Sequence, residues 1–582
     1  YSKNDSDKTI DKVYFEEDKA EIYIINAQSK FHLSETKDSI FLKDILSDVD
    51  NAIKAIEEKK ISINSFKDIS TLIEDNTTVF DFAKKINLEL YDLTNNTSYL
   101  DKTISLHESA LYNRIRARLN TKPNISFSNI PKHIADRENE LRALQNNKEA
   151  NFELLMLNND TWHNFLDTLK TAYPKYYKMR YATIEKPLDS IYKKIPKNTT
   201  AIRYLFIKES LYGVVITAND KYILKLDAKN VLAYISQLSI DQSNIETTSL
   251  KLYELYKQLW KPIENKINTE NIIIIPDGEL FNLSFESLTP KRISSFKEIA
   301  TNSLLAKHTI SYNYSLLLLD KAKKIIDYKN DFVAFAPEFN TKMKEEYSLA
   351  ITDSLSIDKT YLSLLPQPFS VDLAKEYSRL FNGDFFINER ASKQIFTNEA
   401  NEHKIIHIGT HAESNNITPE LSRLIFAKNS SDEDNSLYTY EIYNQNLNSN
   451  LAILTACETG KPTYQSGEGM ISLAHAFNYA GSESILTSLW KIDEQSSAKI
   501  IDLFYKNISN GLAKDKALKK AKLDYISLVE GRTVSPQYWA GLVLIGDTSP
   551  IELQTSSNIL WYILSALLVI LATIFIIKTR KK

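Results

Sequence analysis

The sequence predicts an α/β domain built on a parallel β-sheet, with an α-helical domain of the solenoid type before it and one membrane-spanning helix after it. Three observations carry this prediction. Apolar residues recur at helical spacing through residues 1–198, and short apolar strands alternate with helices from about residue 199. An uncharged apolar run lies near the end of the chain, at Ile559–Ile577.

The first 198 residues have the periodicity of stacked helices. Phe82, Ile86, Leu90 and Leu93 recur on one helical face, and no glycine occurs before Gly213. Polar connectors separate such stretches, which indicates antiparallel helices that each bury one face on the next, as in tetratricopeptide-like repeats. No strict 34-residue repeat is legible, so an irregular helical domain is the alternative.

The pattern changes to strands after residue 198. A meander is predicted at Ala201–Ile207, Leu211–Thr217 and Tyr222–Leu226, and buried strands are predicted at Ile272–Ile275, Val333–Phe335, Ile405–Ile408, Leu451–Leu454, Ser484–Leu486 and Leu542–Ile545. Helices are predicted between them, for example at Gly469–Tyr479 and Ala498–Ser509. Continuous apolar strands that alternate with helices predict a parallel sheet covered on both faces. Chemistry in such sheets gathers beyond the carboxyl ends of the strands.

The segment Ile559–Ile577 predicts a single membrane anchor, reached through a linker at residues 548–558. As a helix its 19 uncharged residues rise about 28 Å, close to the thickness of the hydrocarbon core. A buried helix is the alternative. The basic tail 578–582 follows, and by the positive-inside tendency it places the globular part on the periplasmic or extracytoplasmic side. A tail-anchored cytosolic protein would look similar.

Composition excludes several classes of function. The net charge of −3 gives no electrostatic basis for binding nucleic acid. The sequence contains no phosphate-binding GxxxxGK[ST] loop, so nucleotide hydrolysis is unsupported. Cys457 is the only cysteine, which excludes internal disulfides and a cysteine-based zinc site. We therefore expect no cofactor and no metal.

Two predicted strand ends carry the residues of a Cys–His pair. The strand Ile405–Ile408 leads directly to His411, and the strand Leu451–Leu454 leads to Cys457. A cysteine nucleophile needs an imidazole within hydrogen-bond reach, which takes the thiol proton and later protonates the leaving amine. A histidine about 50 residues before the cysteine is also the order found in caspases.

The residues around this pair resemble the CHAT domain, a caspase-like cysteine peptidase family that is related to separase and often preceded by tetratricopeptide repeats. The resemblance rests on the histidine motif Ile406–Ala412, the cysteine motif Leu451–Gly460, and the segments Gly467–Gly469, Ala474–Phe477, Ser488–Trp490 and Tyr538–Gly541. It covers about residues 199–547. It implies that residues 199–330 form the pseudo-peptidase half of the domain and that residues 331–547 form the catalytic half.

The resemblance also implies roles for single residues. His411 is expected to be the base or acid, Cys457 the nucleophile, and the backbone amides of Ala412 and Cys457 the oxyanion hole. The family often has glycine where Ala412 stands, but alanine keeps the amide donor.

Three acidic residues are candidates for the substrate pocket. Asp493 and Glu494 follow the strand Ser484–Leu486, where related peptidases hold a basic substrate side chain. Capping of the following helix is an equal alternative for Asp493. Glu468 lies between two glycines and lines the same pocket or belongs only to a turn.

The remaining histidines have simpler interpretations. We expect His407 to be packed or hydrogen-bonded within its strand, His475 to be structural and His403 to lie at the surface. A zinc site from His403, His407, His411 and His475 is an alternative. The spacing of the first three would place them on one face only in a helix, whereas their segment is predicted as a strand.

The sequence therefore predicts a membrane-anchored cysteine endopeptidase that cleaves a protein substrate through a thioester acyl-enzyme. Its helical N-terminal region would be the place for an activating protein partner. The alternative is a catalytically inactive scaffold whose caspase-like fold binds protein partners.

Overall fold

The structure is a computed structural model, and it describes residues 19–62, 72, 75–119, 131–145, 152–173, 177, 195–320, 326–351, 357–413, 415, 421–430, 433–455, 463–465, 469–471 and 473–553. Cys457, Glu468, the predicted membrane segment Ile559–Ile577 and the basic tail lie outside these residues.

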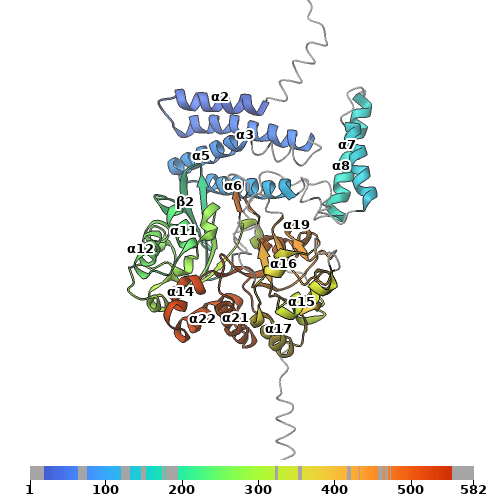
Figure 1. Cartoon of the computed structure of the whole chain (residues 1–582). Helices are drawn as coiled ribbons and strands as arrows, with labels where there is room; N and C mark the ends of the chain where they lie inside the picture. Colours follow the sequence, from blue (N-terminus) through green and yellow to red (C-terminus); the bar gives the residue numbers. More distant parts are fainter. Residues whose placement is uncertain are drawn as a thin grey trace, which may run out of the picture.

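Helices stack on one another in the N-terminal arm (Figure 1). The arm contains α2 Lys19–Leu33, α3 Ser39–Ser62, α5 Thr77–Thr94, α6 Thr97–Leu119, α7 Lys132–Gln145 and α8 Phe152–Ala172. Helices α2, α3, α5 and α6 pack each on the next in chain order, and α7 packs on α8. Phe82, Ile86 and Leu90 are buried as their spacing predicts, whereas Leu93 is exposed because it lies in the last turn of α5. The prediction of stacked helices is confirmed.

The sheet has eleven strands among the described residues, in the order β3-β2-β1-β4-β5-β16-β15-β12-β8-β6-β7. Their bounds are β1 Thr199–Ile207, β2 Ser210–Ile216, β3 Lys221–Leu226, β4 Asn271–Ile275, β5 Thr309–Tyr312, β6 Asn330–Ala336, β7 Asp384–Ile387, β8 His403–Ile408, β12 Leu451–Leu454, β15 Ser484–Ser488 and β16 Leu542–Gly546. Every strand predicted from the sequence is present. The short strands β5 and β7, which contain polar residues, were not predicted.

The sheet is mixed, which corrects the prediction of a parallel sheet. Strands β1, β4, β5 and β16 run parallel to one another, and so do β15, β12, β8, β6 and β7, but β15 and β16 are antiparallel. Between these two strands the chain forms two packed helices, α21 Glu494–Ser509 and α22 Lys514–Leu528. The first helix runs back along the sheet and the second returns to the edge where β15 ends. Strand β16 therefore starts at that edge and runs antiparallel to β15. Apolar strand patterns do not encode this direction.

Helices cover both faces of the sheet. On β6, Phe332 contacts Phe381, just after α17 Pro368–Leu380, and Tyr505 of α21, whereas Phe335 contacts Phe396 of α18 Lys393–Glu399. The two phenylalanines are three residues apart and point to opposite faces. The other helices are α11 Val231–Ile240, α12 Ile245–Leu255, α13 Ile299–Asn302, α14 Leu304–Lys307, α15 Thr341–Ala350, α16 Lys359–Ser363, α19 Thr439–Ile442 and α20 Leu473–Ala480.

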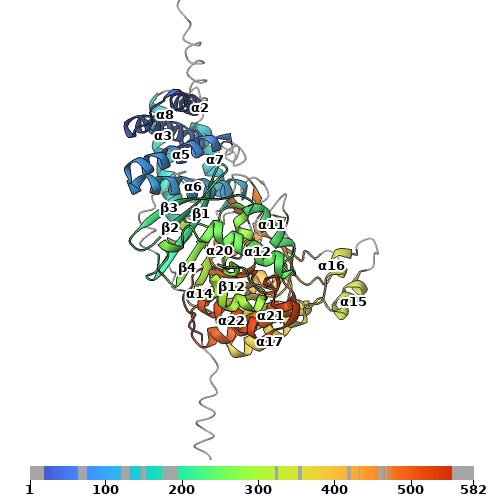
Figure 2. The ribbon, with the colours of Figure 1, turned by 90° about the vertical axis from the view of Figure 1, so that its left-hand side faces the viewer.

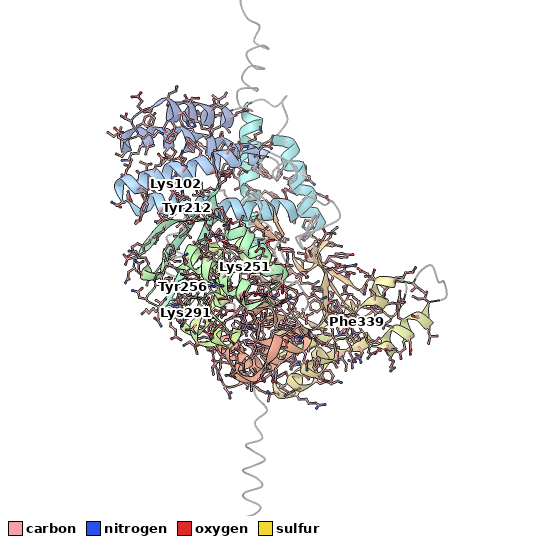
Figure 3. The ribbon with its side chains drawn as sticks, turned by 60° about the vertical axis from the view of Figure 1, so that its left-hand side comes forward. Lys102, Tyr212, Lys251, Tyr256, Lys291 and Phe339 are labelled. Atoms are coloured by element: carbon pink, nitrogen blue, oxygen red, sulfur yellow. The ribbon has the colours of Figure 1, made fainter. Side chains whose placement is uncertain are left out.

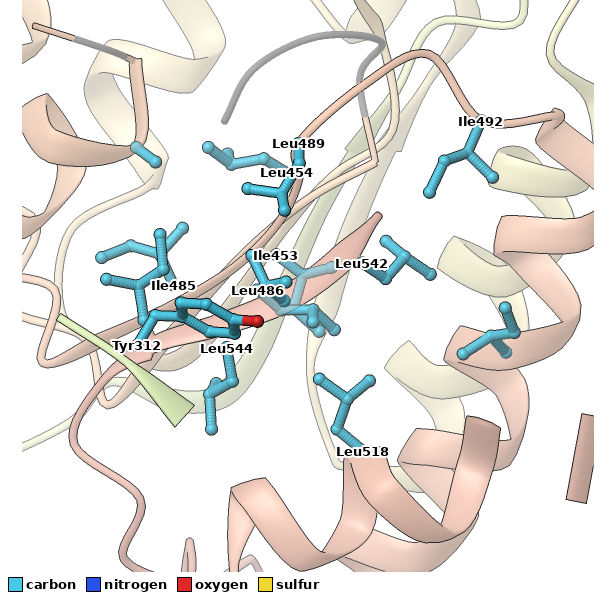
Figure 4. Close-up of a cluster of buried hydrophobic side chains, with 14 of the residues drawn as sticks. Tyr312, Ile453, Leu454, Ile485, Leu486, Leu489, Ile492, Leu518, Leu542 and Leu544 are labelled. Carbon is cyan, nitrogen blue, oxygen red and sulfur yellow. The ribbon is translucent and has the colours of Figure 1, made fainter. Parts of the chain in front are cut away.

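A continuous apolar core joins the two oppositely directed halves of the sheet (Figure 4). Ile453, Leu486 and Leu544 from β12, β15 and β16 lie in it with Tyr312 from β5 and Leu518 from α22. Burial of such side chains stabilises the fold by about 1.5–3 kcal/mol each. The core therefore fixes the strands that carry the candidate site.

The arm docks on the sheet through a buried ion pair. Glu108 of α6 accepts a hydrogen bond from Arg203 Nε of β1 at 2.6 Å, and both side chains have no exposed surface. Glu108 also accepts hydrogen bonds from the backbone N–H of Leu316, at 2.8 Å, and from the hydroxyl of Ser315. Apolar residues of α5 and α6, among them Leu88 and Ile104, pack on β1 and β2 beside this pair. The arm and the sheet thus share one buried interface.

A short hairpin, which begins six residues after Cys457, lies against the arm. It consists of β13 Thr463–Gln465 and β14 Gly469–Ile471, and β14 lies against α6 while β13 lies against the turn Gly278–Asn282. The predicted helix Gly469–Tyr479 is wrong in its first turn, because α20 begins only at Leu473.

The prediction of a membrane-spanning helix, and with it a single-pass membrane location, is withdrawn. In the part of the chain that the structure describes, no helix has the length and apolar character needed to cross a bilayer. The segment Ile559–Ile577, on which the prediction rested, lies outside the described residues.

Candidate functional site

The segments that lead to His411 and Cys457 leave the sheet side by side. Strands β8 and β12 are parallel neighbours, with Ile408 opposite Leu454. One residue further, Thr455 donates both its backbone N–H and its hydroxyl to the carbonyl oxygen of Ile408, each at 3.1 Å. The predicted neighbourhood of the two strand ends is confirmed.

Gly409 permits close packing at the end of β8. Its N–H donates to the carbonyl oxygen of Phe335 in β6 at 3.0 Å, which extends the ladder beyond the strand. A Cβ atom at this position would lie 2.6 Å from Cβ and 2.9 Å from Oγ of Ser370, in the first turn of α17. Glycine is required here because α17 comes so close, and this contact fixes where the chain turns toward His411.

His411 begins a small three-stranded sheet beside the main one. It lies in β9 His411–Glu413, which pairs with β10 Arg423–Ile425, and β10 pairs in turn with β11 Ser436–Tyr438. The imidazole Nε2 lies 2.8 Å from the carbonyl oxygen of Leu365, and a carbonyl only accepts, so Nε2 carries the proton. The lone pair of the neutral ring is then on Nδ1. The Leu365 carbonyl thus selects the tautomer.

One side of the imidazole lies against an aromatic ring. The ring centroids of His411 and Phe339 are 5.2 Å apart, and Phe339 is fully buried with a left-handed backbone (φ 56°). Figure 3 labels Phe339, which precedes the projecting segment formed by α15 and α16; Figure 2 shows how far this segment extends from the body of the molecule. Phe339 therefore limits the orientations available to the imidazole.

The surroundings of His411 favour its neutral form. Burial lowers the pKa of the imidazole below its usual range, and the nearby cations Lys491 and Lys344 lower it further. The Leu365 carbonyl and the Glu413 carboxylate act in the opposite direction but do not prevail. A neutral histidine with a free Nδ1 is suited to accept a proton at neutral pH.

Ala412, the predicted oxyanion-hole residue, is half-buried in β9 opposite Leu424. Its amide is thus fixed within a strand next to His411. The other predicted donor, the amide of Cys457, lies outside the described residues.

Asp493 caps helix α21, which agrees with the capping alternative. Its Oδ2 accepts hydrogen bonds from the backbone N–H of Ser496 at 2.9 Å and from the Ser496 hydroxyl at 2.8 Å. The side chain is otherwise exposed, and Oδ1 makes no hydrogen bond within the described part of the chain. The carboxylate therefore keeps one oxygen that is not engaged in capping.

Glu494 links α21 to the start of α17. Its Oε1 accepts from the backbone N–H groups of Phe369 at 3.0 Å and Ser370 at 3.2 Å. Burial raises the pKa of this carboxyl, and the carboxylates of Asp493 and Glu338 raise it further. Because Ser370 is the residue packed against Gly409, Glu494 lies close to the end of β8.

Of His403, His407 and His475, two are placed as expected. His407 is fully buried, with Nδ1 2.9 Å from the Tyr505 hydroxyl, and burial lowers its pKa to about 4. His475 is buried in α20, with Nδ1 2.5 Å from the Tyr443 hydroxyl. The prediction that His403 lies at the surface is wrong: it begins β8 and is 1% exposed, because β8 is covered on both faces.

Sequence reasoning missed the groups that hold His411. The Leu365 contact uses a backbone carbonyl, which has no signature in the side-chain sequence. Lys344 acts from α15, where its Nζ donates to the carbonyl oxygen of Leu364 at 2.5 Å, and nothing in the local pattern relates it to a histidine 67 positions later. Only the folded chain brings these groups together.

Comparison with known proteins identifies a family for the sheet domain. The model of the CHAT domain matches residues 250–547. Tetratricopeptide repeat protein 28 from Homo sapiens is 32% identical to this chain over 105 residues, and its counterpart from Mus musculus is 29% identical over 105 residues. Each match covers 18% of this chain but only 4% of the relative.

Two solved structures give weaker matches. The separase–securin complex of Saccharomyces cerevisiae is matched over 91% of this chain with a TM-score of 0.39 and 9% identity, and the chain spans 49% of that separase chain. The Arg-specific cysteine proteinase gingipain R is matched over 56% of this chain and 76% of its own length, with a TM-score of 0.32 and 9% identity. Matches this distant do not extend to function.

Proposed function

Because this chain belongs to the CHAT domain family, we propose that it is a cysteine endopeptidase with Cys457 as nucleophile and His411 as base and acid. The observation that carries the proposal is the pair of hydrogen bonds from Thr455 to the carbonyl oxygen of Ile408. These bonds join Thr455, two residues before Cys457, to Ile408, three residues before His411. A cysteine and a histidine that leave adjacent strands in this way suit a catalytic pair.

The tautomer of His411 sets the direction of proton transfer. Nδ1 accepts the proton of the Cys457 thiol, and the sulfur attacks the carbonyl carbon of the scissile peptide bond. The amides of Ala412 and Cys457 donate to the oxyanion of the tetrahedral intermediate. When the C–N bond breaks, the imidazolium gives its proton to the leaving amine. Water, deprotonated by the same nitrogen, then hydrolyses the thioester and releases the carboxylic acid.

The carboxylates near the strand ends favour a substrate with a basic side chain before the scissile bond. Asp493 and Glu494 each use one oxygen for a helix start, and Oδ1 of Asp493 and Oε2 of Glu494 make no hydrogen bond among the described residues. A guanidinium or ammonium group is the natural partner of such oxygens. Glu468 belongs to the same proposed pocket.

The helical arm is proposed to control this site through α6. The docking pair Glu108–Arg203 fixes α6 on the sheet, and α6 lies against β14 of the hairpin that follows Cys457 in the chain. A partner that shifts α6 would therefore disturb the hairpin that begins six residues after the nucleophile in the chain. Removing residues 1–198 is a poor test, because it would leave the fully buried Arg203 guanidinium without its carboxylate.

A digest of a peptide library tests the proposed activity. The full chain is compared with its Cys457→Ala variant, and the cleaved bonds are identified by mass spectrometry. We expect cleavage after Arg or Lys by the wild type only. Equal cleavage by both proteins would exclude Cys457 as the nucleophile, and cleavage after other residues would exclude the basic pocket. Absence of cleavage by either protein, with or without candidate partners, would favour the scaffold alternative.

A conservative substitution tests the role of the arm. Glu108→Gln keeps the size of the side chain but removes the charge that pairs with Arg203. We expect slower cleavage and a changed rate of alkylation at Cys457, because α6 and the hairpin move together. Glu209→Gln, at an exposed position in the turn after β1, is the matched control. Unchanged rates in a Glu108→Gln protein that melts at a lower temperature would show that the arm only stabilises the fold.

A further inference from the structure

A cavity of about 420 Å³ lies between the arm and the meander, away from His411. One wall is helix α5, and the other is formed by β1, β2 and β3. A volume of this size falls within the range of ligand-binding pockets. Figure 3 shows the labelled Tyr212, which lines the cavity, where the meander meets the helices of the arm.

The floor of the cavity is apolar, as the register of the meander dictates. Alternate residues of each strand point toward the arm. On that face α5 and α6 cover the residues near Ala201 and Val214. Toward the β1–β2 turn the floor consists of Ile207, Tyr212 and Ile223. These side chains and Leu88 of α5 form an apolar base that is only partly covered.

The two walls above this floor carry opposite charges. The α5 wall presents the carboxylates Asp81, Glu89 and Asp92 and one cation, Lys85, so its net charge is negative. Glu89 and Asp92 lie about one turn of helix apart. The opposite wall presents Lys208 and Lys225, both exposed and without a hydrogen bond or ion pair among the described residues. Glu89 makes one loose ion pair, at 3.8 Å, to Lys85. The charges on the two walls therefore do not neutralise one another within the protein.

Lys208 is held in an unusual backbone conformation. It has φ 53° in the turn between β1 and β2, in the left-handed region that residues other than glycine seldom adopt. The turn thereby places this ammonium at the rim of the cavity, near the end of the floor.

We propose that this cavity binds a short peptide segment of a protein partner, in which one apolar residue is flanked by a basic and an acidic residue. The apolar side chain enters between Leu88 and Tyr212. The basic side chain pairs with Glu89 and Asp92, and the acidic side chain pairs with Lys208 and Lys225. Burial of the apolar side chain supplies most of the affinity, and the charges select the orientation. The bound segment bridges α5 and the meander, so it ties the arm more firmly to the sheet.

An array of synthetic hexapeptides tests the proposal with the full chain. The peptides carry Lys or Arg, Leu or Phe, and Asp or Glu in every order and number, with glycine at the other positions. The fluorescently labelled protein carries Cys457→Ala, so that no peptide is cleaved. Because only binding is measured, the result is independent of the proposed peptidase activity.

Charge reversal on one wall supplies the decisive comparison. We expect the parent protein to bind peptides with one basic, one apolar and one acidic residue at least about tenfold better than peptides in which glycine replaces the apolar residue. The double variant Lys208→Glu and Lys225→Glu should instead prefer peptides with two basic residues. The control pair Lys229→Glu and Lys291→Glu makes the same change of charge at exposed positions outside the cavity and should bind like the parent.

Three results would overturn the proposal. The first is an array on which no peptide binds the parent protein. The second is binding that depends on peptide charge but not on the apolar residue, which indicates surface attraction only. The third is a preference that the Lys208/Lys225 variant leaves unchanged.

Discussion

The two halves of the sheet each place a histidine beyond the carboxyl ends of parallel strands, but with opposite environments. In the first half, His107 of α6 is buried with Nε2 3.4 Å from Oδ2 of Asp277, which follows β4. In the second half, His411 follows β8, is only half-buried and is held by a backbone carbonyl. The imidazole of His107 is enclosed beside a carboxylate, whereas Nδ1 of His411 makes no hydrogen bond among the described residues.

The difference comes from what covers each edge. Helix α6 covers the ends of β1, β4 and β5, where its Glu108 pairs with Arg203 and binds the chain after β5. Burial alone would raise the pKa of Asp277, but His107 and Arg203 hold it well below its usual range, so this carboxylate is ionised. Burial lowers the pKa of the His107 imidazole, which favours its neutral form. At the other edge, His411 after β8 contacts Leu365 and Phe339, which flank the segment that projects from the body (Figure 2). The same fold therefore provides one edge that docks the arm and one edge that carries the proposed catalytic pair.

Replacing either His411 or His107 with alanine should have the largest effect. The two variants should distinguish the proposed catalytic role of His411 from the structural role of His107. His411→Ala is expected to reduce cleavage by about 10²–10⁴-fold with little change in stability, because the base and acid is lost. His107→Ala is expected to lower the free energy of unfolding, while the cleavage rate of the folded protein stays unchanged. Rates of peptide cleavage and thermal unfolding measure both, with the exposed His133→Ala as control. A His107→Ala protein that folds normally but loses as much activity as His411→Ala would contradict the comparison.

Breaking the docking pair should have the next largest effect. Glu108→Leu leaves the Arg203 guanidinium buried without its partner, which costs about 3–5 kcal/mol of unfolding free energy. The double variant Glu108→Leu and Arg203→Met removes both charges and should recover most of this loss. Denaturant unfolding of the wild type, both single variants and the double variant measures the coupling energy between the two side chains. Equal stability of the single and double variants would show that the ion pair does not hold the arm.

Gly409→Ala should have a moderate effect at the edge that carries the proposed catalytic pair. The added methyl group would lie 2.6 Å from Cβ of Ser370, so either α17 or the end of β8 must move, at a cost of about 1–3 kcal/mol. Cleavage should fall as His411 shifts. Adding Ser370→Gly makes room and should restore part of the activity. A loss that Ser370→Gly does not relieve at all would mean that the contact is not the cause.

The smallest expected effect concerns the pH dependence. The pKa of His411 is lowered by burial and by Lys491, so the imidazole should become protonated only at a pH below the ordinary histidine value of about 6.5. Protonation removes the base and also destabilises the fold, so activity and stability should both fall as the pH drops through this lowered pKa. Lys491→Gln removes a cation and should raise the pKa. Histidine NMR titration in the Cys457→Ala variant measures it; an unchanged or lower pKa in Lys491→Gln would contradict the assignment.

The sequence predicts those helices and strands whose own residues show a recognisable apolar pattern. Apolar runs located β4, β8 and β12, and the residues at their ends identified the two motifs. The pattern did not reveal the reversal at β16, which depends on the two helices before it, or the hairpin β13–β14, which is short and contains glycine. His403 was misplaced because a polar residue in a buried strand has no local signature.

Long-range contacts explain what was missed at the candidate site. The Leu365 carbonyl reaches His411 over 46 positions and Glu108 reaches Arg203 over 95, and neither pair has a recognisable spacing. Asp493 was ambiguous for a different reason. A carboxylate before a helix suits both capping and cation binding, and the fold shows it capping with one oxygen.

The alkylation rate of Cys457 tests the central claim most directly. Because Cys457 is the only cysteine, iodoacetamide consumption by the full chain reports on this thiol alone, and no substrate or partner is needed. If Nδ1 of His411 takes the thiol proton, the wild type should react at pH 7 at least about tenfold faster than His411→Ala, whose thiol should titrate near the free value of about 8.5. Identical rates and pH profiles in the two proteins would show that His411 and Cys457 do not form a pair.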